Sequence, residues 1–272
     1  MVDRYAVIGN PIAHSKSPQI HAAFAKQTGQ NISYEAVLAP IDGFAATVKS
    51  LIAQGYKGAN VTVPFKFEAY KLCNFLHAHA KSSGAYAVNT LIFNGNYNEI
   101  DGENTDGIGL RTDILQNLGF SIENKDILIL GAGGAAHGIL NSLLGAKSIT
   151  IANRTSEKAM EWISGIYDTG DHRIRVNKFE ELDTPFDLIV NATSAGLTGE
   201  KLPLSDKIFN SSTLAYDMMY GVETPFMAQA RANGAQVADG LGMLVEQAAV
   251  AFNMWRKMKP KTAQVIAMLR NK

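Results

Sequence analysis

Short apolar runs alternate with amphipathic stretches along the first hundred residues of the chain. Strands are predicted over residues 5–8, 32–38 and 59–63. Between them the spacing of apolar positions predicts two helices, the first with Ser17 as its N-cap and Gly29 after its end, the second with Asp42 as its cap. This order of strand, helix, strand, helix, strand indicates an α/β fold whose sheet begins parallel.

The pattern changes after Pro64. A helix is predicted from about Lys66 toward His79, followed by two strands over 87–93 and 97–101. Asn94-Gly95-Asn96 lies between these two strands, where an Asn-Gly pair is a strong signal for a β-hairpin. A hairpin pairs its two strands antiparallel, whereas the first three strands are predicted to be parallel. We therefore expect the first sheet to be mainly parallel.

A second series of elements follows a connecting helix that begins at Asn104-Thr105-Asp106 and ends near Gly119. Its strands are predicted over 126–130, 148–152, 186–190 and 214–218, with a helix over 137–144. Two closing helices, from Asp239 to before Pro260 and over 262–269, are expected to return to the first domain. The sequence thus predicts two α/β domains, one of residues 1–105 plus 239–272 and one of residues 106–238, with a cleft between them.

Composition narrows the classes of partner. The 272 residues are 46% apolar, with 25 Lys and Arg against 25 Asp and Glu, and no long basic run is present. Nucleic acid and anionic membrane are therefore excluded as main partners. The single cysteine, Cys73, allows no intramolecular disulfide and is expected to be a packed, inert thiol. No apolar stretch reaches membrane-spanning length, so we expect a soluble cytoplasmic protein, either a monomer or a homodimer.

The segment from Gly131 to Ala136 is typical of a dinucleotide-binding turn. It follows a buried strand and precedes a helix, which is the context that such a glycine motif requires. Gly131 can end the strand with a positive φ, Gly133 lacks a Cβ that would keep phosphate away, and the helix start favours an anion. The second domain is therefore predicted to be a Rossmann domain, although a mobile loop would explain the glycines alone.

The residues after the next strand indicate which dinucleotide is bound. Asn153-Arg154-Thr155-Ser156-Glu157-Lys158 carries no acid at the strand end, where an NAD site normally has one. Arg154 and Lys158 instead suit the 2′-phosphate of NADP. Ordinary solvated charge at a helix start is the alternative, and Glu157 keeps it open.

Several polar residues in the first domain lie at the ends of predicted strands or the starts of helices. They belong to the segments 15–18, 60–66, 89–90 and 104–106 and include Ser15, Ser17, Thr62, Lys66, Asn89 and Asp106. If they converge, they form a cup for a small hydroxyl-rich ligand, in which Lys66 can bind a carboxylate or move a proton. Each residue taken singly also has a structural explanation, as a helix cap, a strand former, a turn residue or a solvated charge.

The ordered set of motifs closely resembles the shikimate dehydrogenase family. The segments that carry the resemblance are 9–18, 60–66, 87–90, 104–107, 131–134, 153–155, 191–193 and 239–244. The resemblance covers nearly the whole chain. It implies an N-terminal substrate domain, a C-terminal Rossmann NADP-binding domain, and NADP-dependent reversible reduction of 3-dehydroshikimate to shikimate in aromatic amino acid biosynthesis.

The resemblance also implies roles for individual residues. Lys66 would be the catalytic lysine and Asp106 its partner carboxylate. Substrate-binding positions would be Ser15, Ser17, Thr62, Lys66, Asn89, Asp106, Tyr220 and Gln247. Positions for NADP would be Gly131, Ala132, Gly133, Gly134, Ala135, Asn153, Arg154, Thr155, Lys158, Met218 and Gly240. No metal is implied.

The chain departs from the family pattern at two positions. Lys158 stands where many relatives carry Arg, which would loosen a bidentate phosphate contact, and Tyr86 interrupts the stretch before Ala87.

Three alternative functions accompany this hypothesis. A dehydrogenase of the same architecture that accepts quinate or uses NAD is the first. A catalytically silent NADP-binding sensor is the second, and the presence of both Lys66 and Asp106 argues against it. The third is a tRNA-dependent or folate-using relative of the same two-domain shape, which is disfavoured because the hydroxyl-rich segment of Ser15 and Ser17 suits a small polyol acid.

Overall fold

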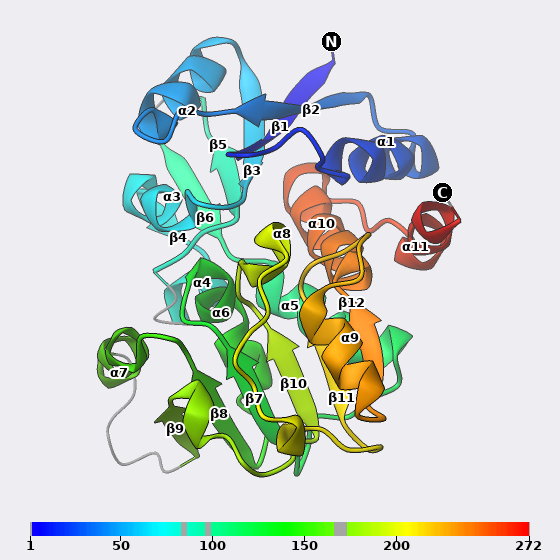
Figure 1. Ribbon diagram of the computed structural model, residues 1–272. Coiled ribbons are helices and arrows are strands. Elements are labelled where there is room, and N and C mark those ends of the chain that lie inside the picture. Colours follow the sequence, from blue (N-terminus) through cyan, green and yellow to red (C-terminus); the bar gives the residue numbers. More distant parts are fainter. Residues whose placement is uncertain (1, 83–85, 96–98, 166–172, 272) are drawn as a thin grey trace. The chain divides into compact units, whose positions relative to one another are not determined.

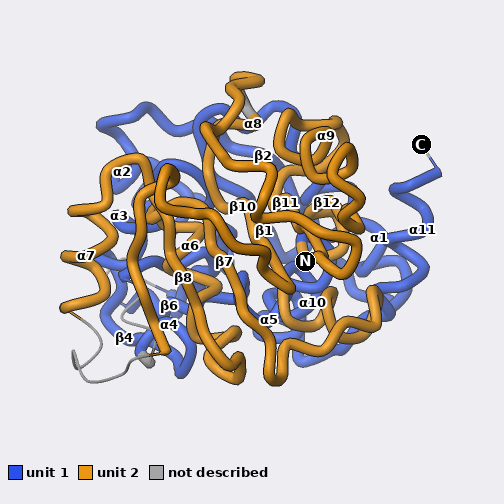
Figure 2. Tube along the Cα trace, turned by 60° about the horizontal axis from the view of Figure 1, so that its bottom comes forward, with its two compact units in different colours: residues 1–109, 244–272 blue, residues 110–243 orange. Residues whose placement is uncertain are grey.

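The computed structural model describes residues 2–82, 86–95, 99–165 and 173–271. The chain divides into two compact units, residues 1–109 with 244–272 and residues 110–243 (Figure 2). The sequence placed the boundaries at 105/106 and 238/239. Both observed boundaries fall inside helices, α5 (Asp106–Thr112) and α10 (Leu241–Arg256), so the chain passes between the units twice without leaving helical structure.

The first unit is built on a six-stranded sheet with strand order β2-β1-β3-β5-β6-β4 (Figure 1). Its strands are β1 (Asp3–Gly9), β2 (Ile32–Leu38), β3 (Tyr56–Val61), β4 (Phe75–Leu76), β5 (Thr90–Phe93) and β6 (Ile100–Glu103). Its other helices are α1 (Ser17–Thr28), α2 (Phe44–Ala53), α3 (Lys66–Leu72), α4 (Ala78–Ser82) and α11 (Thr262–Arg270). Strands β1, β2 and β3 pair in parallel as expected, whereas β5 pairs antiparallel with β3 and β6. The sheet is therefore mixed.

Helices cover both faces of this sheet, and the side chains of β1 point alternately toward the two helical layers. Ala6 and Ile8 join the apolar core formed with α2 and α3, whereas Tyr5 stacks on Trp255 of α10 at 4.6 Å. The indole Nε1 of Trp255 donates to the carbonyl of Leu91 at 3.0 Å. The C-terminal helices thus complete the core of the first unit.

Several local predictions for the first unit are wrong in detail. Helix α1 begins at Ser17 with Lys16 as its N-cap, and α2 begins after Gly43, so neither Ser17 nor Asp42 is the N-cap. Residues 87–89 precede β5, which starts only at Thr90. The expected hairpin is present as the β5/β6 pair, although residues 96–98 of its connection lie outside the described residues.

The single helix predicted from Lys66 to His79 is also wrong. It ends at Leu72, because residues 75 and 76 form β4 and pair in parallel with β6. Tertiary pairing thus overrides local helix propensity. The thiol of Cys73 donates to the carbonyl of Ala69 at 3.1 Å, and burial raises the pKa of Cys73 to about 12, as expected for an inert thiol.

The second unit has a six-stranded, wholly parallel sheet with order β12-β11-β10-β7-β8-β9. Its strands are β7 (Asp126–Leu130), β8 (Ser148–Ala152), β9 (Ile174–Asn177), β10 (Leu188–Asn191), β11 (Leu214–Asp217) and β12 (Gln236–Asp239). Its α-helices are α6 (Gly134–Ile139), α7 (Ser156–Ser164), α8 (Ala195–Thr198) and α9 (Pro225–Ala232). A π-helical segment (Asp113–Asn117) extends α5, and short 3₁₀ segments lie at Leu140–Leu143, Phe179–Glu181 and Asp206–Ile208.

Counted from β7, this sheet has the order 3-2-1-4-5-6 of a dinucleotide-binding Rossmann fold. Ile127 and Ile129 of β7 join one apolar core, while Leu128 and Leu130 join a second, so both faces of the sheet are covered. The helix predicted from 137 begins earlier, at Gly134, directly after the glycine turn. Within the part of the chain that the structure describes, no helix has the length and apolar character needed to cross a membrane.

Candidate active site

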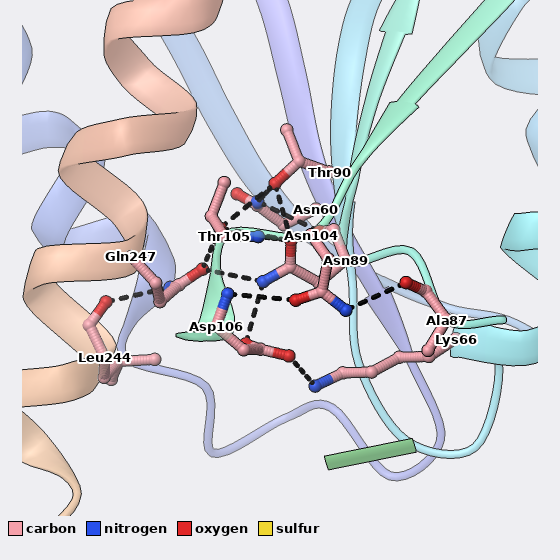
Figure 3. A network of polar contacts seen from close by, with 10 residues as sticks. All are labelled: Asn60, Lys66, Ala87, Asn89, Thr90, Asn104, Thr105, Asp106, Leu244 and Gln247. Atoms are coloured by element: carbon pink, nitrogen blue, oxygen red, sulfur yellow. Dashed lines mark hydrogen bonds and ion pairs between the residues drawn. The ribbon is translucent and has the colours of Figure 1, made fainter. Parts of the chain in front are cut away.

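A buried ion pair in the first unit joins the two residues singled out as catalytic. Lys66 is the first residue of α3, and Asp106 is the first residue of α5. The Nζ of Lys66 donates to Oδ2 of Asp106 at 2.6 Å, and the two side chains are 11% and 7% exposed (Figure 3). Two charges so close and so little hydrated hold one another in a fixed position.

The carboxamide of Asn89 occupies the other side of Asp106. Its Nδ2 donates to Oδ1 of Asp106 at 2.8 Å and to Oε1 of Gln247 at 3.3 Å. Gln247 comes from α10, far along the chain, and its own Nε2 donates to the carbonyl of Leu244 at 2.8 Å. Four residues that the sequence assigned to one site, Lys66, Asn89, Asp106 and Gln247, therefore converge (Figure 3).

Asn104 fixes the start of α5. Its Nδ2 donates to the carbonyl of Ala87 at 2.8 Å, and its Oδ1 accepts from the backbone N of Asp106 at 3.1 Å. On the other side, the carbonyl of Lys66 accepts from the backbone N of Val88. The two segments that carry the ion pair are thus tied to the same stretch of chain before β5.

The remaining candidate residues of this unit lie at the start of α1 and directly after β3. Ser17 is buried, and its backbone N donates to Oγ of Ser15 at 3.3 Å. Thr62 follows β3, and its backbone N donates to the carbonyl of Ile8. Burial raises the pKa of Tyr34 well above its usual range, while a hydrogen bond from Ser17 opposes that rise.

The glycine turn of the second unit has the backbone geometry expected of a phosphate-binding turn. Gly131 has φ +105°, and a Cβ there would lie 3.2 Å from the carbonyl oxygen of Ala192, so a side chain is disfavoured twice. Gly133 is different, because its φ of −96° suits any residue and a Cβ would meet no atom within 4 Å. Protein packing does not require glycine at 133, whereas close approach of a phosphate does. Gly131 to Ala135 therefore fit a dinucleotide pyrophosphate.

Two cations follow β8, as the sequence predicted. Arg154 and Lys158 are both exposed, and the guanidinium of Arg154 lies 3.3 Å from the carboxylate of Glu200. Asn153 closes the turn with a hydrogen bond to the carbonyl of Thr155 at 2.9 Å. Since both cations are open to solvent and the ion pair of Arg154 with Glu200 lies at the surface, they remain able to contact a phosphate.

The last predicted positions lie after β11. Met218 and Tyr220 are half-buried. Gly240 is buried, and a Cβ on it would overlap the backbone of Met218, so this glycine permits two chain segments to touch. Asp217, which the sequence analysis did not single out, fixes the turn by accepting from Met219 N at 2.9 Å, Thr224 Oγ1 at 2.6 Å and Asn191 Nδ2 at 3.0 Å.

Further polar residues of the first unit join the network although the sequence analysis assigned them no individual role. Asn60, Thr90 and Thr105 are buried and join the network around Asn89, and Tyr34 joins it through Asn60. Asn60, Thr90 and Thr105 lie inside the quoted motifs, so the sequence held a signal for them. Tyr34 had none, because its contact depends on how β2 is placed in the sheet.

The fold and the site together define a two-domain, dinucleotide-dependent oxidoreductase. Three family models match the chain: the shikimate dehydrogenase substrate binding domain over residues 7–91, shikimate / quinate 5-dehydrogenase over 113–198, and the shikimate 5′-dehydrogenase C-terminal domain over 240–270. The chain is 56% identical over 273 residues to the shikimate dehydrogenase (NADP(+)) of Methylobacillus flagellatus, with 99% of each chain covered.

Solved structures give the same result. An Ael1 enzyme from Pseudomonas putida matches with a TM-score of 0.88 at 44% identity, covering 98% of each chain. The shikimate 5-dehydrogenase of Thermus thermophilus, solved in complex with NADP(H) and shikimate, matches with a TM-score of 0.85 at 30% identity, covering 100% of this chain and 99% of that one. The chain belongs to the shikimate dehydrogenase family.

Proposed function

We propose that this chain catalyses the NADP-dependent, reversible reduction of 3-dehydroshikimate to shikimate, with Lys66 as the proton donor and acceptor and Asp106 as its partner. Membership in the family supports the reaction. The buried Lys66–Asp106 pair carries the assignment of roles, because it offers an ammonium held at 2.6 Å by a carboxylate within a cluster of amide groups. The predicted cytoplasmic location stays a prediction.

Reduction of a ring ketone leaves an oxyanion that must receive a proton. NADPH, when bound, supplies the hydride. Lys66 presents N–H donors that can polarise the carbonyl oxygen and then protonate it, and in the reverse direction its amine accepts the hydroxyl proton. Asp106 keeps Lys66 in place, and its carboxylate can accept a hydrogen bond from a ring hydroxyl.

The remaining polar groups of the first unit suit the other parts of a polyhydroxylated acid. Asn89 and Gln247 offer amide groups beside Asp106 that can bond to ring hydroxyls. We assign the substrate carboxylate to Ser15 and Ser17, at the start of the twelve-residue helix α1, where backbone N–H groups favour an anion. Thr62, and Tyr220 of the second unit, complete the proposed substrate contacts.

In the second unit, Gly131 to Ala135 would hold the pyrophosphate of NADP. The fit rests on the open space above Gly133. Arg154 and Lys158 would bind the 2′-phosphate, with Asn153 and Thr155 shaping the turn between them. Met218 and Gly240 would line the nicotinamide end.

Steady-state kinetics with shikimate and quinate, each against NADP and NAD, test the reaction. We expect the highest kcat/KM with shikimate and NADP. Equal or better turnover of quinate, or of NAD, would overturn the corresponding half of the proposal. A protein that binds NADP but oxidises neither acid would be the silent sensor considered above.

Lys66→Ala tests the proton transfer. We expect kcat to fall by roughly 10²–10⁴-fold, the usual contribution of a positioned acid or base, while shikimate still binds. Lys71→Ala, in the last turn of the same helix, is the matched control and should keep wild-type kcat. Near-normal turnover of Lys66→Ala would remove Lys66 from the proposed role.

A further inference from the structure

The amide of Asn89 has two possible orientations, and only one of them lets it donate to Asp106. In the observed orientation Oδ1 faces Thr90 and Thr105, while Nδ2 faces Asp106 and Gln247. Reversal would place the amide oxygen against the carboxylate of Asp106, where two acceptors meet without a proton. What holds this amide therefore also decides how Asp106 is presented to Lys66.

A chain of donors reaches Asn89 from β2, the edge strand of the sheet. The phenol of Tyr34 donates to Oδ1 of Asn60 at 2.7 Å, which forces the Nδ2 of Asn60 to point the other way. That Nδ2 donates to Oγ1 of Thr90 at 3.1 Å and to the carbonyl of Asn89 at 3.2 Å. Asn60 and Thr90 are directly opposite residues of β3 and β5, so the contact is built into the strand register.

The hydroxyl of Thr90 in turn orients the amide of Asn89. This hydroxyl carries a single proton and accepts from Asn60. Of the two oxygens left to receive that proton, Oδ1 of Asn89 is nearer, at 2.9 Å against 3.4 Å for Oγ1 of Thr105. The side chain of Thr90 is fully buried, which excludes water as a substitute partner. The backbone N of Thr105 donates to the same oxygen at 2.9 Å, and the Thr105 hydroxyl lies 3.1 Å from it, so Oδ1 faces donors and Nδ2 is turned toward Asp106.

From this geometry, and resting on the proposed function, we propose that Thr90 is a positioning residue for the reaction. Its hydroxyl holds the Asn89 amide in the orientation that donates to Asp106, and Asp106 in turn holds Lys66. Thr90 acts through Asn89 and does not itself meet the substrate. Loss of the Thr90 hydroxyl should therefore lower kcat/KM for shikimate and leave the affinity for NADP unchanged.

Thr90→Val removes the hydroxyl and keeps the shape, and Thr90→Ser restores the hydroxyl. We expect Thr90→Val to lower kcat/KM for shikimate by about 5- to 20-fold, the effect of roughly one or two lost buried hydrogen bonds, with an unchanged KM for NADP. Thr90→Ser should stay within about threefold of wild type. Equal losses in the two variants, or a Thr90→Val enzyme within twofold of wild type, would overturn the assignment.

A double-mutant cycle with Asn89→Ala separates positioning from general destabilisation. If Thr90 acts through Asn89, Thr90→Val should cost less than about twofold in the Asn89→Ala background. If the losses in kcat/KM of the two single variants multiply in the double variant, the proposal is contradicted. Should Thr90→Val fail to fold, Tyr34→Phe tests the same chain of hydrogen bonds one step earlier. We expect Tyr34→Phe to lower kcat/KM for shikimate by about 2- to 5-fold and to leave KM for NADP unchanged. An unchanged Tyr34→Phe enzyme would then overturn it.

The wild-type assay in the same series distinguishes the two proposals. A wild-type protein that does not act on shikimate refutes the proposed function. An active wild type whose Thr90→Val variant behaves normally refutes only the role of Thr90.

Discussion

The two units hold their functional residues in different ways. In the first unit, Lys66, Asn89 and Asp106 are buried and fixed by side-chain hydrogen bonds to one another. In the second unit, Gly133 and Arg154 are exposed, and the geometry of the site lies in the backbone of a glycine turn. The candidate residues of the first unit are preorganised by side chains, and those of the glycine turn in the second unit by main chain.

This difference matches the chemistry proposed for each unit. Proton transfer needs a donor placed to within a fraction of an ångström, which buried and interlocked side chains provide. Holding a pyrophosphate needs backbone N–H groups and freedom from side chains, which glycine provides. Substitutions in the first unit should therefore affect turnover, and substitutions in the glycine turn should affect coenzyme binding.

Among further substitutions that test this contrast, Asp106→Asn should have the largest effect. The amide keeps the shape and one oxygen but removes the charge that holds the ammonium of Lys66. We expect kcat to fall by roughly 10²–10³-fold, with a smaller change in KM for NADP. Steady-state kinetics and a thermal melt on the same preparation check this. A variant whose kcat is near that of the wild type would show that turnover does not depend on the interlocked side chains of the first unit.

Gly133→Ala and Gly131→Ala sharpen the contrast inside the second unit. At 133 the added methyl meets nothing within 4 Å, so stability should change by less than about 0.5 kcal/mol while KM for NADP rises about tenfold or more. At 131 the positive φ makes any side chain strained, so we expect a loss of about 1–3 kcal/mol of unfolding free energy. Urea unfolding and NADP titration measure both, and a Gly133→Ala protein with normal NADP affinity would contradict the phosphate assignment.

Arg154→Ala should have a smaller effect, confined to coenzyme choice. Loss of one exposed, charge-assisted phosphate contact should raise KM for NADP by about tenfold and leave KM for NAD unchanged. Glu200→Gln is the matched control, because it removes the carboxylate 3.3 Å from Arg154 and should preserve the preference for NADP. If both KM values rise together in Arg154→Ala, the arginine does not read the 2′-phosphate.

The same contrast explains what the sequence could and could not predict. The glycine turn was predicted correctly because its signal is local: a strand, glycines at defined spacing and a helix within about a dozen residues. The chain from Asn60 through Thr90 to Asn89 was not predicted, because it depends on Asn60 lying opposite Thr90 across an antiparallel pair of strands that are distant in sequence. Strand register between distant segments is set by the folded sheet and has no local signal.

The break at Cys73 has the same origin. Helical spacing continues past Leu72, yet the pairing of Phe75 and Leu76 with β6 ends the helix. A Cβ on Gly102 would overlap the Cys73 side chain, so the close packing that fixes this turn depends on a glycine in another strand of the sheet. Such a contact becomes visible only in the folded structure.

The last prediction concerns the pH dependence of stability and rests on His21, which lies in the aromatic layer between α1 and the sheet. Its ring is fully buried, stacks on Tyr34 at 4.0 Å and has a pKa lowered by burial to about 3, against an ordinary value of 6.5. Between these values the unfolded chain binds a proton that the folded protein does not. Stability contributed by the neutral ring is therefore complete above pH 6.5 and is lost as the pH falls toward 3, by at most about 1.4 kcal/mol per pH unit.

His21→Phe keeps a stacked ring and removes the titrating group, so its unfolding free energy should fall less steeply between about pH 6.5 and 4 than that of the wild type. The exposed His14 provides the matched control, and His14→Gln should keep the wild-type slope. Urea midpoints at several pH values measure the slopes. Parallel slopes for His21→Phe and wild type would show that the folded protein protonates His21 as readily as the unfolded chain does, and hence that the layer behind Tyr34 and Asn60 admits water.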